Sequence, residues 1–193
     1  MTKKITFMLD MDGVCCDWIT SALIAINRED LINNWKAGVS NLKEMTGLPE
    51  EDIWRKIDAL GSDWWKNLKE YPWFWDLYTQ LKKKGDVIFC TSPGWDSNSF
   101  KGKIEWLQDK FDRDFKDYIF TNKKFYVAKE THILIDDNDR QCEEFIKHGG
   151  TAVVFPQLWN STHEFETSIK LDKEYNLKKL QYVFNKIEEF LIE

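Results

Sequence analysis

Acidic or hydroxyl side chains stand at the ends of three apolar runs, and together they could bind a metal ion and a phosphate. The six residues are Asp10, Asp12, Thr91, Ser92, Asp136 and Asp137. Clustered carboxylates are unfavourable unless a positive charge joins them. A hard divalent cation with oxygen ligands, most simply Mg²⁺, would supply that charge. Because a carboxylate can also act as a nucleophile, this combination predicts phosphoryl transfer to a protein acid.

Three lysines offer a further positive charge just before the last of these runs. They are Lys123, Lys124 and Lys129, and the residues alone do not choose among them. A lysine would neutralise phosphoryl oxygens, while hydroxyls and the N–H groups of a tight turn would hold the rest of the phosphate. The alternatives are solvated lysines and, for Asp10 to Gly13, a purely structural turn closed by glycine.

Five short apolar runs predict the strands that position these residues. They span 5–9, 86–90, 118–120, 132–135 and 151–155. Continuous rather than alternating runs are typical of a parallel sheet covered on both faces. Helical patterns follow over 99–111, 139–150 and 176–193, so we expect a doubly wound, Rossmann-like α/β fold. Ligands of such sheets bind beyond the carboxyl ends of the strands, which would bring the six residues to one edge.

The interval between the first two runs predicts a helical insertion. Residues 10–85 show no convincing strand, and a simple crossover needs far fewer residues. Helical patterns cover 21–35, 41–47, 49–61 and 63–68, and seven of the ten tryptophans lie between Trp18 and Trp75. We therefore expect a core of residues 1–17 and 78–193 and a small helical cap of 18–77, whose tryptophans mostly pack between helices.

Composition limits the class of protein. The formal net charge is −6 and the pI is about 5.2, which argues against a surface that holds long nucleic acid. No apolar run is long enough for a signal sequence or a membrane span. Four cysteines without scaffold spacing fit a reduced, cytoplasmic setting.

The ordered motifs resemble those of the haloacid dehalogenase superfamily. DMDGV at 10–14, TS at 91–92, a lysine and IDD at 135–137 follow one another along most of the chain. More narrowly, DMDGVCCDW, FCTSP and ILIDD are similar to the 5′(3′)-deoxyribonucleotidases, the cytosolic type C 5′-nucleotidases. This resemblance implies Mg²⁺-dependent hydrolysis of nucleoside monophosphates, a small helical cap after the first motif and a possible homodimer.

The resemblance also implies roles for the acids. Asp10 would be the nucleophile that becomes an aspartyl-phosphate, and Asp12 would be the general acid and base. The metal ligands would be Asp10, the backbone carbonyl of Asp12, and Asp137, with Asp136 beside it.

The same resemblance implies which residues would hold the substrate. Thr91 and Ser92 would bind the phosphate, together with Lys124, which matches the family through TNKK but with a longer gap to IDD. Trp18 matches an aromatic position that contacts the base or sugar.

Two other functions remain open at this point. One is a phosphatase of the same superfamily that acts on sugar phosphates or another small metabolite. The other is a non-catalytic binding module with the same fold, although four acids kept together favour catalysis.

Overall fold

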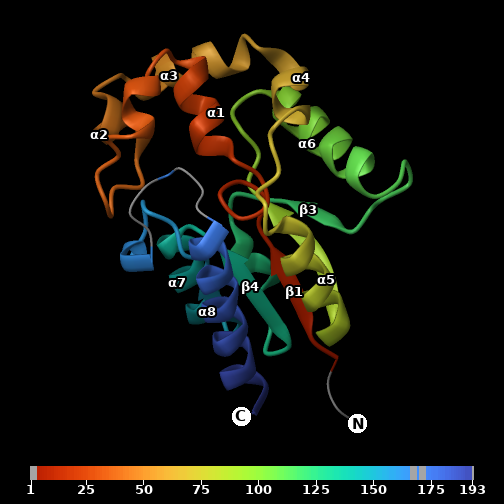
Figure 1. Ribbon diagram of the computed structural model, residues 1–193. Helices are drawn as coiled ribbons and strands as arrows, with labels where there is room; N and C mark the ends of the chain where they lie inside the picture. Colours follow the sequence, from red (N-terminus) through yellow and green to blue (C-terminus); the bar gives the residue numbers. More distant parts are fainter. Residues whose placement is uncertain (1–3, 166–168, 170–172, 193) are drawn as a thin grey trace.

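The centre of the molecule is a five-stranded parallel sheet with the strand order β3-β2-β1-β4-β5 (Figure 1). The computed structural model describes residues 4–165, 169 and 173–192. The strands are β1 Thr6–Leu9, β2 Asp86–Thr91, β3 Tyr118–Phe120, β4 His132–Asp136 and β5 Thr151–Val154. The five predicted strands and the doubly wound α/β fold are therefore confirmed.

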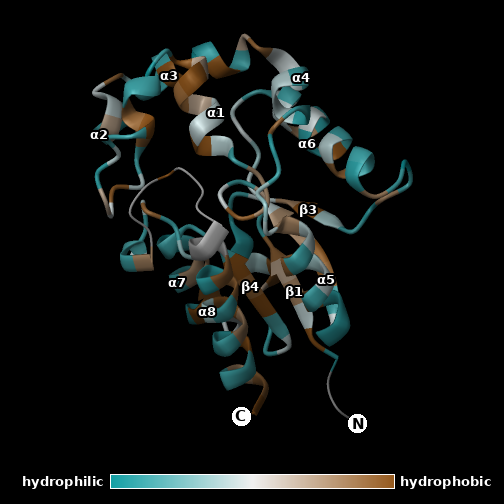
Figure 2. Ribbon diagram, in the orientation of Figure 1, coloured by the Kyte–Doolittle hydropathy of each residue, from teal (hydrophilic) through white to brown (hydrophobic). Residues whose placement is uncertain are grey.

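Both faces of the sheet are covered by helices, which explains why the strand sequences are continuously apolar. On one face, Phe7 and Leu9 of β1 pack with residues of α5 (Phe74–Lys84) and α8 (Lys173–Ile192). On the other face, Met8 packs with Phe145 of α7 (Asp139–Lys147). Figure 2 shows β1 and β4 as largely hydrophobic ribbons between helices with hydrophilic segments.

The segment after β1 forms short helices beyond the carboxyl ends of the strands (Figure 1). They are α1 Trp18–Ala25, the 3₁₀ helix η1 Glu29–Ile32, α2 Leu42–Thr46, α3 Glu50–Asp58 and α4 Gly61–Lys66. The predicted helix over 21–35 is wrong in its second half, because the chain leaves α-helical geometry after Ala25 and Asn27 has a φ of 60°. The division into a cap of 18–77 and a core stays a prediction.

The remaining helices complete the fold. They are α6 Ser97–Lys110 and the 3₁₀ helices η2 Lys124–Val127 and η3 His163–Phe165. The helices predicted over 99–111, 139–150 and 176–193 are present, but position 193 lies outside the described residues. So do residues 1–3, 166–168 and 170–172 of the predicted core. Within α6, Phe100 is 40% exposed, while Ser99, Gly102 and Lys103 are buried. No helix among the described residues is long and apolar enough to cross a membrane.

Candidate active site

The strand order brings the two acidic motifs side by side. Strand β2 follows β1 in the chain and lies on one side of it in the sheet, and β4 lies on the other side. A crevice therefore opens at the carboxyl ends of these strands. Leu9 pairs with Ile135, and the Asp10 N–H donates to the Ile135 carbonyl over 2.9 Å. Asp10 and Asp136 are therefore neighbours across two strands that are distant in the sequence.

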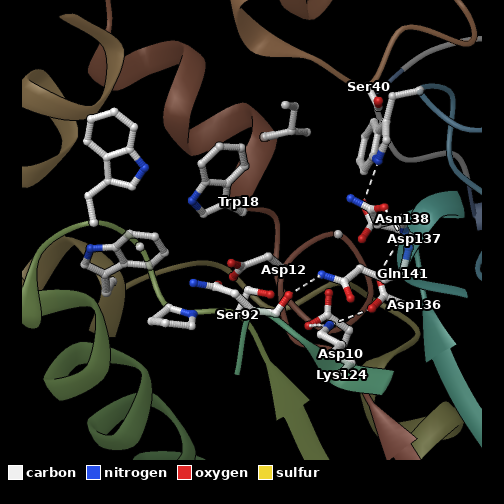
Figure 3. A pocket seen from close by; sticks show the side chains of 18 of the residues that line it. Asp10, Asp12, Trp18, Ser40, Ser92, Lys124, Asp136, Asp137, Asn138 and Gln141 are labelled. Atoms are coloured by element: carbon white, nitrogen blue, oxygen red, sulfur yellow. Dashed lines mark hydrogen bonds and ion pairs between the residues drawn. The ribbon is translucent and has the colours of Figure 1, made fainter. Parts of the chain in front are cut away.

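These strand ends form the floor of a cavity of about 660 Å³ (Figure 3). Of the eight site residues predicted from the sequence, seven line it: Asp10, Asp12, Trp18, Ser92, Lys124, Asp136 and Asp137. Thr91 does not line the cavity; it is fully buried beneath the floor. The sequence thus predicted which residues come together, while their individual roles stay predictions.

The opposite wall of the cavity is aromatic. Trp18 of α1, Trp54 of α3 and Trp95, from the loop after β2, all line it. The rings of Trp54 and Trp95 are stacked at 5.8 Å, and those of Trp18 and Trp54 are 6.0 Å apart. The indole N–H of Trp18 is buried and has no hydrogen-bond acceptor among the residues that the structure describes. Trp54 and Trp95 were not singled out from the sequence, because tryptophan is also the ordinary choice for packing between helices.

A tight turn after β1 holds the first acids in place. The Met11 carbonyl accepts hydrogen bonds from the N–H groups of Cys15 and Cys16 at 2.7 and 2.9 Å. Gly13 has a φ of +75°, and a Cβ there would lie 2.2 Å from Asp137 Oδ2. Only glycine fits both the left-handed backbone and this close approach of the second acidic motif.

The turn is also tied to the far end of the chain. The side-chain amide of Gln157 donates to the Gly13 carbonyl, and Lys179 of α8 donates to Gln157 Oε1 over 2.9 Å. Neither residue was predicted, since nothing in a lone glutamine or lysine indicates a partner so distant in the sequence.

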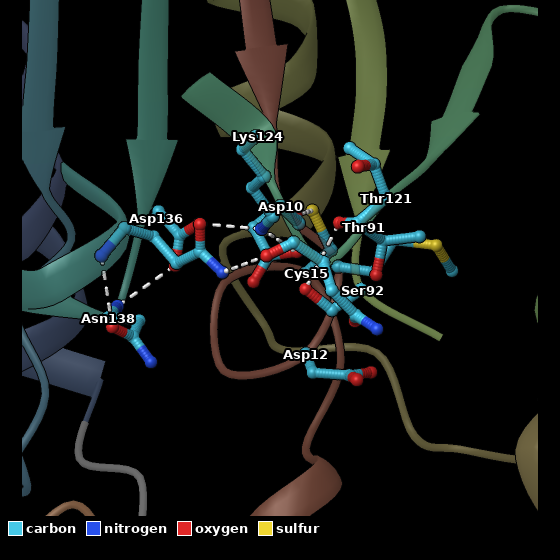
Figure 4. A network of polar contacts seen from close by, with 12 residues as sticks. Asp10, Asp12, Cys15, Thr91, Ser92, Thr121, Lys124, Asp136 and Asn138 are labelled. Carbon is cyan, nitrogen blue, oxygen red and sulfur yellow. Dashed lines mark hydrogen bonds and ion pairs between the residues drawn. The ribbon is translucent and has the colours of Figure 1, made fainter. Parts of the chain in front are cut away.

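Lys124 lies between two carboxylates (Figure 4). Its Nζ is 2.7 Å from Asp10 Oδ1 and 2.6 Å from Asp136 Oδ2, and the side chain is almost fully buried. Burial acts to lower the pKa of Lys124, but the Asp10 and Asp136 carboxylates outweigh it and raise that pKa above its usual value. Lys123 and Lys129 are exposed and do not line the cavity, so of the three candidate lysines Lys124 is the one at the site.

Three carboxylates around this lysine could hold a metal ion. Oxygens of Asp10, Asp136 and Asp137 all lie within 4.8 Å of one another. Burial, opposed by Lys124, raises the pKa of Asp136 to about 6, and burial together with the Asp136 and Asp10 carboxylates raises that of Asp137 well above its usual value. Three acids facing one ammonium leave excess negative charge, so the oxygen-only donor set fits a hard divalent cation.

An indole and a backbone amide orient the second pair of acids. The indole N–H of Trp159 donates to Asp137 Oδ2 over 2.6 Å, and the N–H of Asn138 donates to Asp136 Oδ1 over 2.9 Å. Trp159 was not predicted, because it follows β5 rather than a motif. Such outer partners fix the direction in which a ligand oxygen points.

Asp12 is held by a lysine that the sequence did not reveal. Lys103 of α6 donates to Asp12 Oδ2 over 2.7 Å and to Thr91 Oγ1 over 2.9 Å. Burial raises the pKa of Asp12, and the ammonium of Lys103 opposes that rise. The one signal for Lys103 is its spacing of three and four residues from the buried positions Ser99, Trp106 and Leu107. A lysine on an apolar stripe is unusual unless it is paired.

Comparison with known proteins identifies the family of the chain. The family model described as 5′ nucleotidase, deoxy (pyrimidine), cytosolic type C protein matches residues 3–178. Two relatives, both named "Putative 5'(3')-deoxyribonucleotidase" and from Staphylococcus aureus strains MSSA476 and MW2, are each 30% identical over 162 residues, which is 83% of this chain and 86% of theirs.

Solved structures share the fold at low sequence identity. A hydrolase from Pseudomonas syringae has a TM-score of 0.50 and 13% identity, with 96% of this chain and 99% of that one covered. A haloacid dehalogenase-like family hydrolase from Xanthomonas campestris has a TM-score of 0.51 and 14% identity, with 97% and 93% covered. The chain therefore has a haloacid dehalogenase-like fold and belongs to the cytosolic type C 5′-nucleotidase family, whose name denotes hydrolysis of phosphoric monoesters.

Proposed function

We propose that the protein is a Mg²⁺-dependent phosphatase of nucleoside 5′-monophosphates, deoxyribonucleotides among them. The observation that carries the proposal is a single cavity with acids and a lysine on its floor and tryptophans on its opposite wall. A phosphate suits the floor, where Lys124 and a bound cation would offset its charge. A nucleobase suits the aromatic wall, because flat rings stack on indoles. A sugar phosphate would leave that wall without a partner.

The proposed reaction has two halves, and Asp10 carries the phosphoryl group between them. A carboxylate oxygen of Asp10 attacks phosphorus, the bond from phosphorus to the ester oxygen breaks, and Asp12 gives its proton to the departing 5′ oxygen. In the second half Asp12 takes a proton from water, whose oxygen attacks the phosphorus of the aspartyl-phosphate. Inorganic phosphate leaves and the Asp10 carboxylate is restored.

The chain's other polar groups hold the phosphate during both halves. Lys124 neutralises one phosphoryl oxygen and keeps Asp10 in place, since it touches that carboxylate. Ser92 lines the cavity, and its hydroxyl donates to the Thr121 carbonyl over 3.3 Å, so it can turn toward a phosphate oxygen. Thr91 supports this phosphate site from beneath the cavity floor, through its position at the end of β2.

Asp10 and Asp137, with the backbone carbonyl of Asp12, would hold the metal ion. A bound Mg²⁺ supplies charge neutralisation on the phosphoryl oxygens. Asp136 is engaged by Lys124 and by the N–H of Asn138, so it serves chiefly to hold that lysine.

A panel of phosphate esters tests the proposal. We expect release of phosphate from nucleoside 5′-monophosphates with Mg²⁺ and none after chelation. The Asp10→Asn variant should lose turnover but remain folded, which a thermal unfolding measurement would show. A strong preference for hexose phosphates would reject the nucleotide assignment, and full activity of Asp10→Asn would reject the nucleophile. No turnover of any ester would favour a binding module.

A further inference from the structure

Lys103 is a fully buried cation that touches both motifs on the floor of the cavity. Its ammonium donates to Asp12 Oδ2 over 2.7 Å, to Thr91 Oγ1 over 2.9 Å and to the Ser92 carbonyl over 2.7 Å. An ammonium has three N–H donors, so each of them has an acceptor here. The lysine thereby joins the turn after β1 to the end of β2.

The burial of Lys103 comes from the way α4 packs on α6. A Cβ at Gly102 would lie 2.3 Å from the Ser62 carbonyl oxygen and 2.4 Å from Cβ of Trp65, so the absent side chain lets the two helices meet. The ring of Trp65 then lies over the Lys103 ammonium, 5.2 Å from Nζ. Lys103 is 0% exposed as a result, and it has no route to solvent that would offset the desolvation of its charge.

The geometry leaves the two oxygens of Asp12 in different surroundings. Oδ2 is fixed by the Lys103 ammonium, whereas Oδ1 has the Cys16 thiol at 3.5 Å, a weak donor. The Asp12 side chain is 26% exposed and lines the cavity, so it can meet a substrate. One oxygen is therefore anchored and the other is available for proton exchange.

We propose that Lys103 is a positioning residue, which anchors Asp12 Oδ2 so that Oδ1 is aimed at the oxygen of the departing alcohol and later at the attacking water. This inference rests on the proposed function, because it takes Asp12 as the acid and base. It adds a residue on α6, outside the four sequence motifs. Because Trp65 of α4 covers the Lys103 ammonium, the packing of α4 also helps to keep Asp12 oriented.

The inference predicts a dependence on the leaving group. A nucleotide needs a proton at its departing ribose oxygen, whereas p-nitrophenyl phosphate releases a stable anion that needs none. Because general acid catalysis contributes about 100- to 10,000-fold, loss of its orientation should lower kcat/KM for a nucleotide by about 10- to 100-fold. The value for p-nitrophenyl phosphate should fall only by about 3-fold or less, since kcat/KM reports steps up to departure of the alcohol.

The experiment compares Lys103→Met with wild type on a deoxynucleoside 5′-monophosphate and on p-nitrophenyl phosphate, with Mg²⁺ present. Lys101→Met is the matched control, because Lys101 is an exposed lysine on the same helix. Lys103→Met in an Asp12→Asn background should add little further loss for the nucleotide, since both changes remove the same function. If Lys103→Met does not fold, Lys103→Gln, which keeps an N–H donor, should show a smaller contrast in the same direction.

The outcomes separate this inference from the function on which it rests. Equal losses on both esters, or no loss on the nucleotide while wild type is active, would overturn the positioning role and leave the nucleotidase assignment standing. Wild type that hydrolyses neither ester would overturn both.

Discussion

Removal of the Lys124 ammonium should destabilise the protein in a pH-dependent way. Lys124→Met keeps most of the length and apolar stem of the side chain but leaves Asp10 and Asp136 buried without their shared cation. Breaking a buried ion pair by removing one partner costs about 3 to 5 kcal/mol. For a chain of this size each kcal/mol lowers the melting temperature by about 2 to 4 °C, so we expect a fall of about 6 to 20 °C at about pH 8.

The sign of the pH effect follows from the Asp136 carboxyl. Its pKa is already raised to about 6, and Lys124 acts to lower it, so the variant should raise it further. A carboxyl whose pKa is higher in the folded state binds its proton more tightly there, so that state loses stability as pH rises through the folded pKa. At about pH 5 Asp136 of the variant is protonated, so the loss of stability of Lys124→Met relative to wild type should shrink by at least about half.

Thermal unfolding without Mg²⁺ at the two pH values measures this effect, with Lys123→Met as the control at an exposed neighbouring lysine. The double variant Lys124→Met with Asp136→Asn should recover part of the loss, because it removes one uncompensated charge. A Lys124→Met protein as stable as wild type at about pH 8 would refute the reasoning. A penalty that stays constant with pH would refute it equally.

Three further predictions concern the metal site and the turn. Trp159→Phe, which removes the donor to Asp137, should weaken Mg²⁺ binding by about 10- to 100-fold in calorimetry, and unchanged affinity would contradict this. In Gly13→Ala, the new Cβ sits on a backbone of positive φ and forces Asp137 aside. Steady-state kinetics of the folded variant should therefore show a kcat about 100-fold lower. Because burial raises the pKa of Asp137, a proposed metal ligand, protons compete with the metal there, and the rise in melting temperature with Mg²⁺ should be larger at about pH 8 than at about pH 5.

The sequence predicted the strands and the floor of the cavity because both depend on local patterns. The five apolar runs end where polar motifs begin, and the rule that parallel strands share a carboxyl edge brings those motifs together. The choice of Lys124 over its neighbours needed the structure, since burial between Asp10 and Asp136 is a tertiary property. The predicted homodimer stays a prediction.

The features that the sequence did not reveal depend on packing between distant segments. Helix α5 was not predicted, and the expected cap boundary at 77 falls inside it. The burial of Lys103 on α6 was not predicted, because it depends on the acceptors that Asp12 and Thr91 offer beneath the helix. The end of α1 at Ala25 follows from a left-handed residue, Asn27, that propensity alone does not place.

The central claim is that Asp10 carries the phosphoryl group, and trapping the intermediate tests it most directly. Rapid acid quench during turnover of a nucleotide, followed by borohydride reduction of any acyl phosphate, converts a phosphorylated aspartate to homoserine, which peptide mass spectrometry locates. We predict homoserine at position 10 in wild type quenched during turnover, and none in wild type quenched without substrate or in the Asp10→Asn variant. Steady release of phosphate with no modification at position 10, or with modification of another acid, would contradict the account.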